Sequence, residues 1–574
     1  MFEDPTSSCL RSLGLALGLL SLSACNQASP DAPLGDGRLP NGKTPEQVTP
    51  GTCTEGSILP GPSPLRRLTR FEYNNTLRDL LGDTTAPGNR LPLEEQSLGF
   101  DNDANVLKVS RLLAEAYVGA TQLLADAAVP ELGTWVSCAA QAQAPGSDPV
   151  QAEQCASQFI DAFGPRAYRR ALAPEERARM LALYTSARQS FDFNGAVGAV
   201  IEAMLLSPQF LYRLESTLPV AGNPNVLAVD SWGLASRLSY FLWGSMPDPA
   251  LFDVVRAGQL VTAADVRAQA ERMFDDPRTR SVVRHFNRYW LDIGGVDGQT
   301  KDAALFPDYT SAIGPLLRQQ TENFVEHVYF GGAGTLNDLL TAPYTFMNGP
   351  LATFHGLSNG PTGEAFVKVD LDPTRHSGVL TEPSILSWNA TADRTHPILR
   401  GVFIRRKFLC QEPPPPPPGV VDSRGTIADP NATERERLAI HSQDPICAAC
   451  HASIEPIGLA FENFDATGRW RDLEGGRPVD ATGHILGTDV EGDVNGAIEL
   501  TQKLAQSEQV RQCVALNWFR FANGRGETEQ DVCSTQRVNQ RFADSGGNLR
   551  ELVLTMTQTD AFLYRMAPSS EAMP

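Results

Sequence analysis

Apolar residues recur at intervals of three and four along most of the chain between residues 65 and 291. In the segment 65–82, leucines and one phenylalanine follow this spacing, and Thr69 and Gly82 stand where a helix would start and stop. The same pattern occurs at 111–128, 152–163, 173–190, 195–214, 231–243, 263–274 and 279–291. No regular alternation of strands and helices suggests a doubly wound sheet. The spacing therefore predicts a mainly α fold with a multi-helical body.

Six consecutive prolines, from Pro413 to Pro418, form the strongest boundary in the sequence. Such a run adopts the polyproline II conformation and acts as a semi-rigid spacer. We predict a connecting region at 359–419 that ends in this rod, and a C-terminal domain at 420–574. The helical body before it is expected to divide into domains at 65–130, 131–220 and 221–358.

The first 24 residues have features of an export signal. Arg11 precedes an apolar run at 13–24 that is too short to span a bilayer as a mature helix. The run ends in Leu-Ser-Ala before Cys25, which resembles the bacterial lipobox, in which cleavage precedes a cysteine that is then lipidated. We therefore predict a lipoprotein signal peptide at 1–24, lipidation of Cys25 and a flexible tether at 25–64. Two acidic residues, Glu3 and Asp4, depart from a basic leader and leave a misread start as the alternative.

Charge and hydropathy limit the partners and the location. The chain has 48 basic and 67 acidic residues, a net charge of -19, so it repels phosphate backbones and anionic lipids. Nucleic acid is excluded as a partner on this ground. No later segment offers about 18 uninterrupted apolar residues, so membrane attachment would rest on the N-terminal lipid alone. We expect a lipid-anchored protein of the cell envelope, on the periplasmic side or the outer surface.

Cys447, Cys450 and His451 form the most specific motif in the chain, Cys-Ala-Ala-Cys-His. A c-type haem requires two thiols that add to its vinyl groups and an imidazole that reaches the iron, and this spacing supplies all three. The motif predicts one covalent haem c with His451 as an axial ligand. A zinc site, a redox dithiol and a plain disulfide are the alternatives. A zinc site would require further donors and usually a second paired motif, and a redox dithiol would require a βαβ unit around it.

The residues after His451 could complete a haem site. Six apolar residues would form a wall for the macrocycle: Ile454, Pro456, Ile457, Leu459, Phe461 and Phe464. A carbonyl near Pro456 could hold the second imidazole nitrogen, and Arg469 and Arg471 could pair with the propionates. The second axial ligand stays open between His441, His484, Met556 in the helix-like stretch 549–564, a vacant position and a ligand from the helical body.

Six cysteines remain once the leader, the lipidated residue and the two haem thiols are set aside. An even number in an oxidising compartment favours disulfides. Short separations favour Cys138 with Cys155 and Cys513 with Cys533, and Cys53 with Cys410 then follows by elimination.

Several blocks together resemble a known family of proteins. The blocks are 67–76, 166–170, 207–213, 234–243, 377–381, the proline run, and Cys450-His451 followed by 465–469. They are similar to the multidomain haem-containing lipoproteins of planctomycetes and myxobacteria, built from successive domains of unknown function of the 1587, 1595, 1592, 1588 and 1585 types. The resemblance implies a C-terminal cytochrome c-like α domain, which a helix at 549–564 would close. For the function of the chain, the resemblance implies only the haem chemistry of this motif.

Three functions are consistent with these features. The first is electron transfer in the envelope, with the helical body docking a redox partner protein or a substrate. The second is a scaffold with a structural haem that binds an envelope polysaccharide or protein through Trp232, Trp243, Trp290 and Tyr240. The third is a haem peroxidase or oxygenase.

Overall fold

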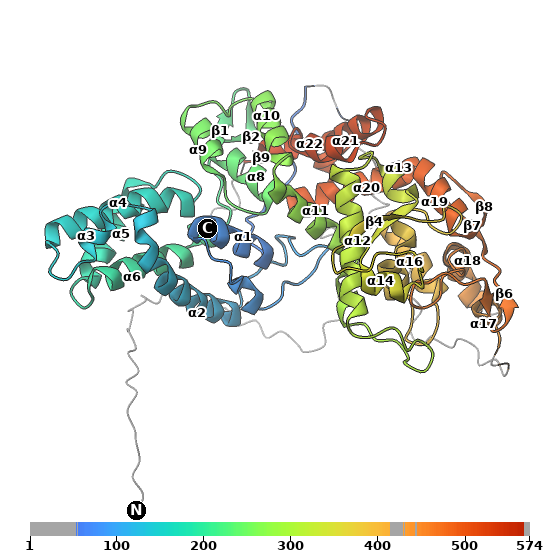
Figure 1. The fold of residues 1–574 in the computed structure, drawn as a ribbon. Helices are drawn as coiled ribbons and strands as arrows, with labels where there is room; N and C mark the ends of the chain where they lie inside the picture. The colour runs from blue at the N-terminus through green and yellow to red at the C-terminus, as the bar shows by residue number, and fades with distance from the viewer. Residues whose placement is uncertain (1–52, 54–55, 414–428, 430, 442–444, 568–574) are drawn as a thin grey trace, which may run out of the picture. The chain divides into compact units, whose positions relative to one another are not determined.

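The computed structural model is mainly α-helical, with small antiparallel sheets between the helices (Figure 1). It describes residues 53, 56–413, 429, 431–441 and 445–567, and the side chains of 440–450 are not among the described parts. The predicted leader, Cys25 and most of the tether and of the proline run lie outside these residues. Within the described residues, no helix is both long and apolar enough to cross a membrane.

The N-terminal helices are α1 (Arg70–Leu81), α2 (Arg111–Ala128), α3 (Ala139–Ala142), α4 (Pro149–Ala167), α5 (Pro174–Ala187), α6 (Phe193–Leu206) and α7 (Pro208–Leu211). The central helices are α8 (Ser231–Trp243), α9 (Pro249–Arg256), α10 (Ala263–Phe274), α11 (Pro277–Trp290), α12 (Ile313–Phe330), α13 (Leu336–Thr341), α14 (Gly349–Phe354), α15 (Pro383–Trp388) and α16 (Pro397–Lys407). The C-terminal helices are α17 (Glu434–His441), α18 (Pro445–Leu459), α19 (Gly496–Gln506), α20 (Glu508–Asn523), α21 (Val532–Asp544), α22 (Leu549–Met556) and α23 (Asp560–Leu563).

Nine short strands in the described residues pair locally, with one exception. They are β1 (Thr217–Val220), β2 (Asn223–Val229), β3 (Tyr344–Met347), β4 (Val367–Asp370), β5 (Leu473–Glu474), β6 (Arg477–Pro478), β7 (Thr482–Ile485), β8 (Gly492–Asn495) and β9 (Tyr564–Met566). The strands pair antiparallel as β1 with β2, β3 with β4, β5 with β6 and β7 with β8, whereas β9 adds to the β1–β2 hairpin from the far end of the chain. The C-terminal segment therefore folds back onto the middle of the protein.

The helix signals at α1 work as the sequence predicts. Thr69 caps the helix and accepts a hydrogen bond from the Glu72 N–H, while the Glu72 carboxylate accepts one from the Thr69 N–H. Gly82 ends the helix with φ of 74°, a left-handed conformation that favours glycine.

Two of the predicted helices are shorter than their apolar spacing indicates. The segment 195–214 breaks after Leu206, because Pro208 disfavours helical backbone at the residue before it. The helix predicted over 549–564 ends at Met556, where the Thr557 and Thr559 hydroxyls each donate to the backbone carbonyl three residues earlier. The expected single closing helix is therefore wrong: α22, a turn, α23 and β9 take its place.

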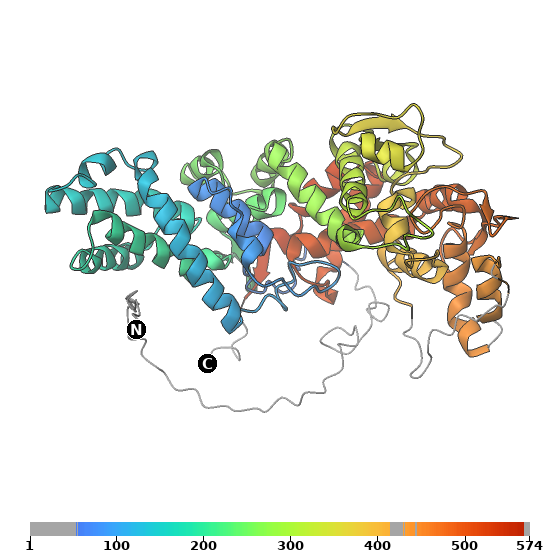
Figure 2. The same cartoon turned by 60° about the horizontal axis from the view of Figure 1, so that its bottom comes forward.

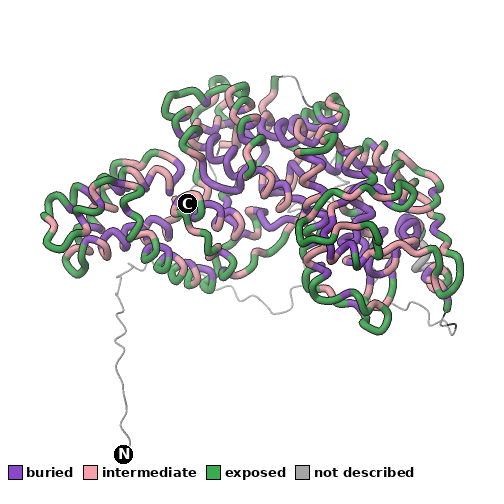
Figure 3. The backbone as a smooth tube through the Cα atoms, in the orientation of Figure 1, coloured by how far each residue is buried: buried purple, intermediate pink, exposed green. Residues whose placement is uncertain are grey.

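Two large cores stabilise the described chain, and most helices contain buried residues (Figure 3). One core lies among α1–α7. The larger one joins α8–α13, α15 and α16 to α18–α22, with buried members from Phe100 to Phe562. Residues on both sides of the proline run thus share one core.

Helices α16 and α18 lie on either side of the proline run in sequence and pack closely against each other, within the yellow-orange to orange part of the chain in Figure 2. They run antiparallel, because Gly401 lies against Ile454 and Gly458 against Pro397. A Cβ at Gly401 would lie 2.1 Å from the Ile454 carbonyl oxygen, and one at Gly458 would lie 1.8 Å from that of Pro397. Only glycine permits this approach at the two positions. The packing of the described residues therefore does not divide at the proline run.

All six predicted disulfide cysteines are bonded, but in a different pairing. Cys138–Cys155 is confirmed, whereas Cys513 bonds to Cys410 and Cys533 bonds to Cys53. The pairings Cys513–Cys533 and Cys53–Cys410 are wrong. Separation in sequence is a poor guide here, because the partners are brought together by the shared core: Cys410 follows α16, and α20 carries Cys513 beside it.

Removal of the Cys138–Cys155 disulfide should lower the free energy of unfolding moderately. The Cys138→Ala/Cys155→Ala variant opens a loop of 17 residues, and loop-closure entropy predicts a loss of about 3 kcal/mol in the free energy of unfolding. Urea denaturation of the oxidised variant and wild type measures this difference. Equal stability of the two proteins would contradict the prediction.

Candidate functional site

The Cys-Ala-Ala-Cys-His motif lies within α18. Cys447, Cys450 and His451 occupy positions of one helix, separated by three and four residues, a spacing that places residues on the same helix face. The side chains of both cysteines are outside the described residues.

His451 is held by a carboxylate four residues later on the same helix. Its Nδ1 lies 2.6 Å from Glu455 Oε1, with 18% and 10% of the two side chains exposed. Metal-bound histidines generally donate their second ring N–H to such a partner, which orients the imidazole and raises its basicity. The carboxylate of Glu455, and not a carbonyl near Pro456, takes this position. Glu455 was missed, although its spacing of four residues from His451 is visible in the sequence.

The donor set fits a c-type haem. Two thiol residues precede an imidazole whose Nδ1 is already engaged, and an imidazole held through Nδ1 binds metal through Nε2. Cys447, Cys450 and His451 are the residues that would hold the group.

The apolar residues after His451 serve the protein core. Five of the six are buried, Ile454, Ile457, Leu459, Phe461 and Phe464, and most of them belong to the large core that includes α16. Arg469 and Arg471 are engaged by acids: Arg471 pairs with Glu462 and Glu474, and Arg469 lies near Asp308 and Asp465. Protein packing thus already accounts for the buried wall and for both arginines.

The three candidates for a second axial ligand lie in different settings. His441 ends α17, and its side chain is outside the described residues. His484 lies on β7, 39% exposed, with its Nδ1 2.7 Å from Asp493 Oδ1. Met556 is 1% exposed in the core at the end of α22, which packs on α10, α20 and α21. His484 lies on β7, which packs against α18.

A cavity of about 530 Å³ opens between α17, α18 and the β7–β8 hairpin. Arg435, Pro456, Leu459, Gly483 and Asp493 are among the residues that line it, and His451 is not. Its size is in the range of small-molecule sites. His484 is the neighbour of one lining residue and the hydrogen-bond partner of another.

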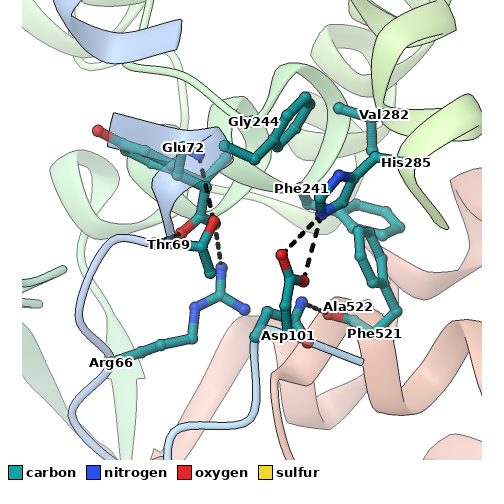
Figure 4. A pocket seen from close by; sticks show the side chains of 13 residues that line it. Arg66, Thr69, Glu72, Asp101, Phe241, Gly244, Val282, His285, Phe521 and Ala522 are labelled. Carbon is teal, nitrogen blue, oxygen red and sulfur yellow. Dashed lines mark hydrogen bonds and ion pairs between the residues drawn. The ribbon is translucent and has the colours of Figure 1, made fainter. Parts of the chain in front are cut away.

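A second polar site surrounds His285 (Figure 4). His285 Nε2 lies 3.1 Å from Asp101 Oδ2, and its ring stacks on Phe71 at 4.1 Å. Burial acts to raise the pKa of Asp101, but the charge and hydrogen bond of His285, together with weaker hydrogen bonds, outweigh it and the pKa is lowered. The adjoining cavity holds only about 10 Å³, room for one water molecule. The pair is therefore too enclosed for a substrate and ties α11 to the loop before α2.

The aromatic residues considered for recognition are mostly in the interior. Trp243, Trp290 and Tyr240 are buried, and only Trp232 is partly exposed. They do not form a surface that could bind a polysaccharide.

Five family models match successive parts of the chain, each described as a protein of unknown function. The matches are DUF1587 over residues 66–130, DUF1595 over 155–215, DUF1592 over 229–357, DUF1588 over 376–474 and DUF1585 over 492–562. No curated protein and no solved structure matches the chain. The DUF1588 match includes Cys447, Cys450 and His451. It also spans the proline run, so the family boundary and the packing of the described residues agree that no domain boundary lies at the prolines. The chain is thus built from the successive domains DUF1587, DUF1595, DUF1592, DUF1588 and DUF1585, in that order.

Proposed function

We propose that this protein is an exported c-type haem protein that transfers electrons in the cell envelope. It would be anchored through a lipid on Cys25 and would carry one haem c on Cys447, Cys450 and His451. The helical body would dock the redox partner. The single observation that carries the proposal is the hydrogen bond between His451 and Glu455 directly behind the Cys-x-x-Cys motif.

Each residue has a distinct role in this proposal. Cys447 and Cys450 fix the cofactor covalently, so it is not lost outside the cytoplasm. His451 supplies the imidazole, and Glu455 fixes its orientation and increases its donor strength, which favours the oxidised state and lowers the reduction potential. When bound, the haem supplies one-electron chemistry.

The first test is covalent haem itself. Full-length protein matured in a host with the attachment machinery should give a pyridine haemochrome spectrum of haem c at one haem per chain. The Cys447→Ser/Cys450→Ser variant should lose covalent haem entirely, because no thiol remains to add to the vinyl groups. The Cys138→Ala/Cys155→Ala variant is the matched control and should keep it. Wild-type protein without covalent haem would refute the proposal.

The role of Glu455 has its own readout. Glu455→Gln keeps the side-chain shape but replaces the carboxylate by a neutral amide, so His451 becomes a weaker donor. The haem content should stay unchanged while the midpoint potential rises. Glu491→Gln, at an exposed acid near the β7–β8 turn, is the control. An unchanged potential in Glu455→Gln would show that this carboxylate does not act on the axial ligand.

The same carboxylate favours one second function, reaction with peroxide or oxygen. A strongly donating axial imidazole supports such chemistry when the opposite coordination position is vacant. A high-spin ferric spectrum and turnover with hydrogen peroxide would favour this function. A low-spin spectrum that changes on His484→Ala would instead favour electron transfer with His484 as the second axial ligand.

A further inference from the structure

Four buried arginines from distant parts of the chain lie together: Arg66, which also lines the pocket of Figure 4, and Arg213, Arg237 and Arg525, here called the arginine cluster. Each side chain is at most 9% exposed. Together with Glu215 they line a cavity of about 40 Å³. Three of the segments that resemble the family, 67–76, 207–213 and 234–243, converge here, and the Arg213 N–H donates to the Arg66 carbonyl at 2.9 Å.

The backbone around the cluster is shaped to admit these side chains. Gly524 has φ of 59°, and a Cβ there would lie 2.6 Å from Arg66 Nη1. Gly61 has φ of 64°, and a Cβ there would lie 2.6 Å from Arg525 Nη2. Both glycines are required by conformation and by close approach. The guanidinium groups are therefore held in place by the fold.

Three of the four arginines have a carboxylate of their own. The pairs are Arg66 with Glu72 at 2.6 Å, Arg237 with Glu215 at 2.6 Å and Arg525 with Asp531 at 2.7 Å. The last two are bidentate, because each arginine donates from two nitrogens to both oxygens of the acid. One arginine of the cluster therefore has no carboxylate of its own.

Arg213 is that arginine. Its side chain makes no hydrogen bond to the described residues, and its Nε is buried without a partner. The nearest carboxylate oxygen is Glu72 Oε1 at 4.0 Å, which Arg66 already binds. The guanidinium lies over the Tyr240 ring at 5.2 Å. Burial, and then the charge of Arg66, lower the pKa of Arg213 to about 9, so it stays protonated at neutral pH.

A buried charge without a partner is costly, and arginine does not escape the cost by losing its proton. The parallel N–H groups of a guanidinium match two oxygens of a carboxylate, sulfate or phosphate. The cavity is about three times the space that one water molecule requires, which suits a small oxyanion. Arg66 adds a second buried Nε without a partner at the same place.

We propose that the arginine cluster binds a small oxyanion, with Arg213 as its main ligand and Arg66 as its second. Phosphate, sulfate and the carboxylate of an organic acid share this chemistry. The site lies far along the chain from the haem motif, and it is independent of the proposed function. It binds an anion inside a protein whose net charge is -19, because the local excess of guanidinium groups outweighs the overall charge.

Calorimetric titration of the wild-type chain tests the site directly. The full-length protein, dialysed exhaustively against chloride, is titrated with inorganic phosphate, sulfate and acetate at constant ionic strength. We expect one site per chain with a Kd of about 1 mM or tighter for at least one of them. The anion that binds most tightly shows whether the site prefers a tetrahedral anion or a carboxylate. The absence of saturable binding in all three arms would overturn the proposal.

Variants then assign the site to Arg213. Arg213→Met should weaken binding at least about tenfold, and Arg213→Lys less, because lysine keeps the charge but not the paired donors. Arg177→Met on the surface of α5 is the control and should bind as wild type. In chloride, Arg213→Met should melt higher than wild type, since it removes an unpaired charge, whereas Arg237→Met should melt lower, since it strands Glu215. Unchanged binding, or a lower melting temperature of Arg213→Met in chloride, would overturn the assignment.

Discussion

Arg400→Met is expected to lower the free energy of unfolding by about 3–5 kcal/mol, the cost of breaking a buried ion pair. Arg400 lies on α16, before the proline run, and donates to four backbone carbonyls, those of Leu386, Phe461, Phe464 and Asp465. Its Nη1 also lies 3.6 Å from Glu462 Oε1, and both side chains are 2% exposed. Methionine fills much of the volume but leaves these carbonyls and part of the Glu462 charge without a partner.

Chemical denaturation at neutral pH measures this loss. Burial lowers the pKa of Arg400 to about 10, so it is still charged under these conditions. Arg406→Met is the matched control, because Arg406 lies on the same helix with half of its side chain exposed. A surface change of this kind should stay within about 0.5 kcal/mol. If both variants were equally stable, Arg400 would not join the two sides of the proline run.

Glu382→Gln is expected to stabilise the protein at alkaline pH relative to wild type. Glu382 is fully buried before α15, and its carboxyl oxygens accept hydrogen bonds from Thr345 at 2.7 Å and Thr321 at 3.2 Å. Burial raises its pKa to about 8, so the folded protein holds this group protonated at neutral pH. Glutamine is neutral at every pH and keeps the shape of the side chain.

The direction of this change in stability with pH follows from proton linkage. Because the folded pKa lies above the ordinary value of 4.5, the stability that Glu382 contributes is complete below pH 4.5 and is lost as the pH rises toward 8. His376, 3.7 Å away, has its pKa lowered by burial to about 4, so its contribution is lost in the opposite direction, as the pH falls from 6.5 toward 4. The window above pH 6.5 therefore isolates Glu382.

Urea denaturation at pH 6.5 and pH 9 should show the advantage of Glu382→Gln over wild type growing by about 2 kcal/mol. Glu115→Gln, at an exposed position of α2, should show no such trend. A constant difference between Glu382→Gln and wild type across this window would mean that Glu382 is ionised in the folded protein at neutral pH.

Local sequence signals predicted most helices and the confirmed local disulfide. The cap at Thr69, the stop at Gly82 and the apolar spacing of α2, α4, α5, α8, α10 and α11 depend on interactions within a few residues, which sequence displays directly. The Cys138–Cys155 bond is of the same kind, since its partners are 17 residues apart. Where a prediction failed, at 195–214 and 549–564, Pro208 and the threonines after Met556 interrupt a continuous apolar face.

The candidate haem residues were visible for the same reason. Cys447, Cys450 and His451 form one turn of helix, and even Glu455 could have been found from its spacing. The arginine cluster could not, because Arg66, Arg213, Arg237 and Arg525 lie on segments up to 459 residues apart by number. In sequence each is an ordinary basic residue without a distinguishing neighbour.

By itself, then, the sequence determined the mainly α character, the Cys-x-x-Cys-His motif and the number of cysteines available for disulfides. The tertiary structure alone decided the partners of Cys53, Cys410, Cys513 and Cys533, the packing of α16 on α18 across the proline run, and the unpaired charge at Arg213. The physical reason is that these features depend on contacts between distant segments, where burial and the count of opposite charges are set by the whole core and not by neighbours along the chain.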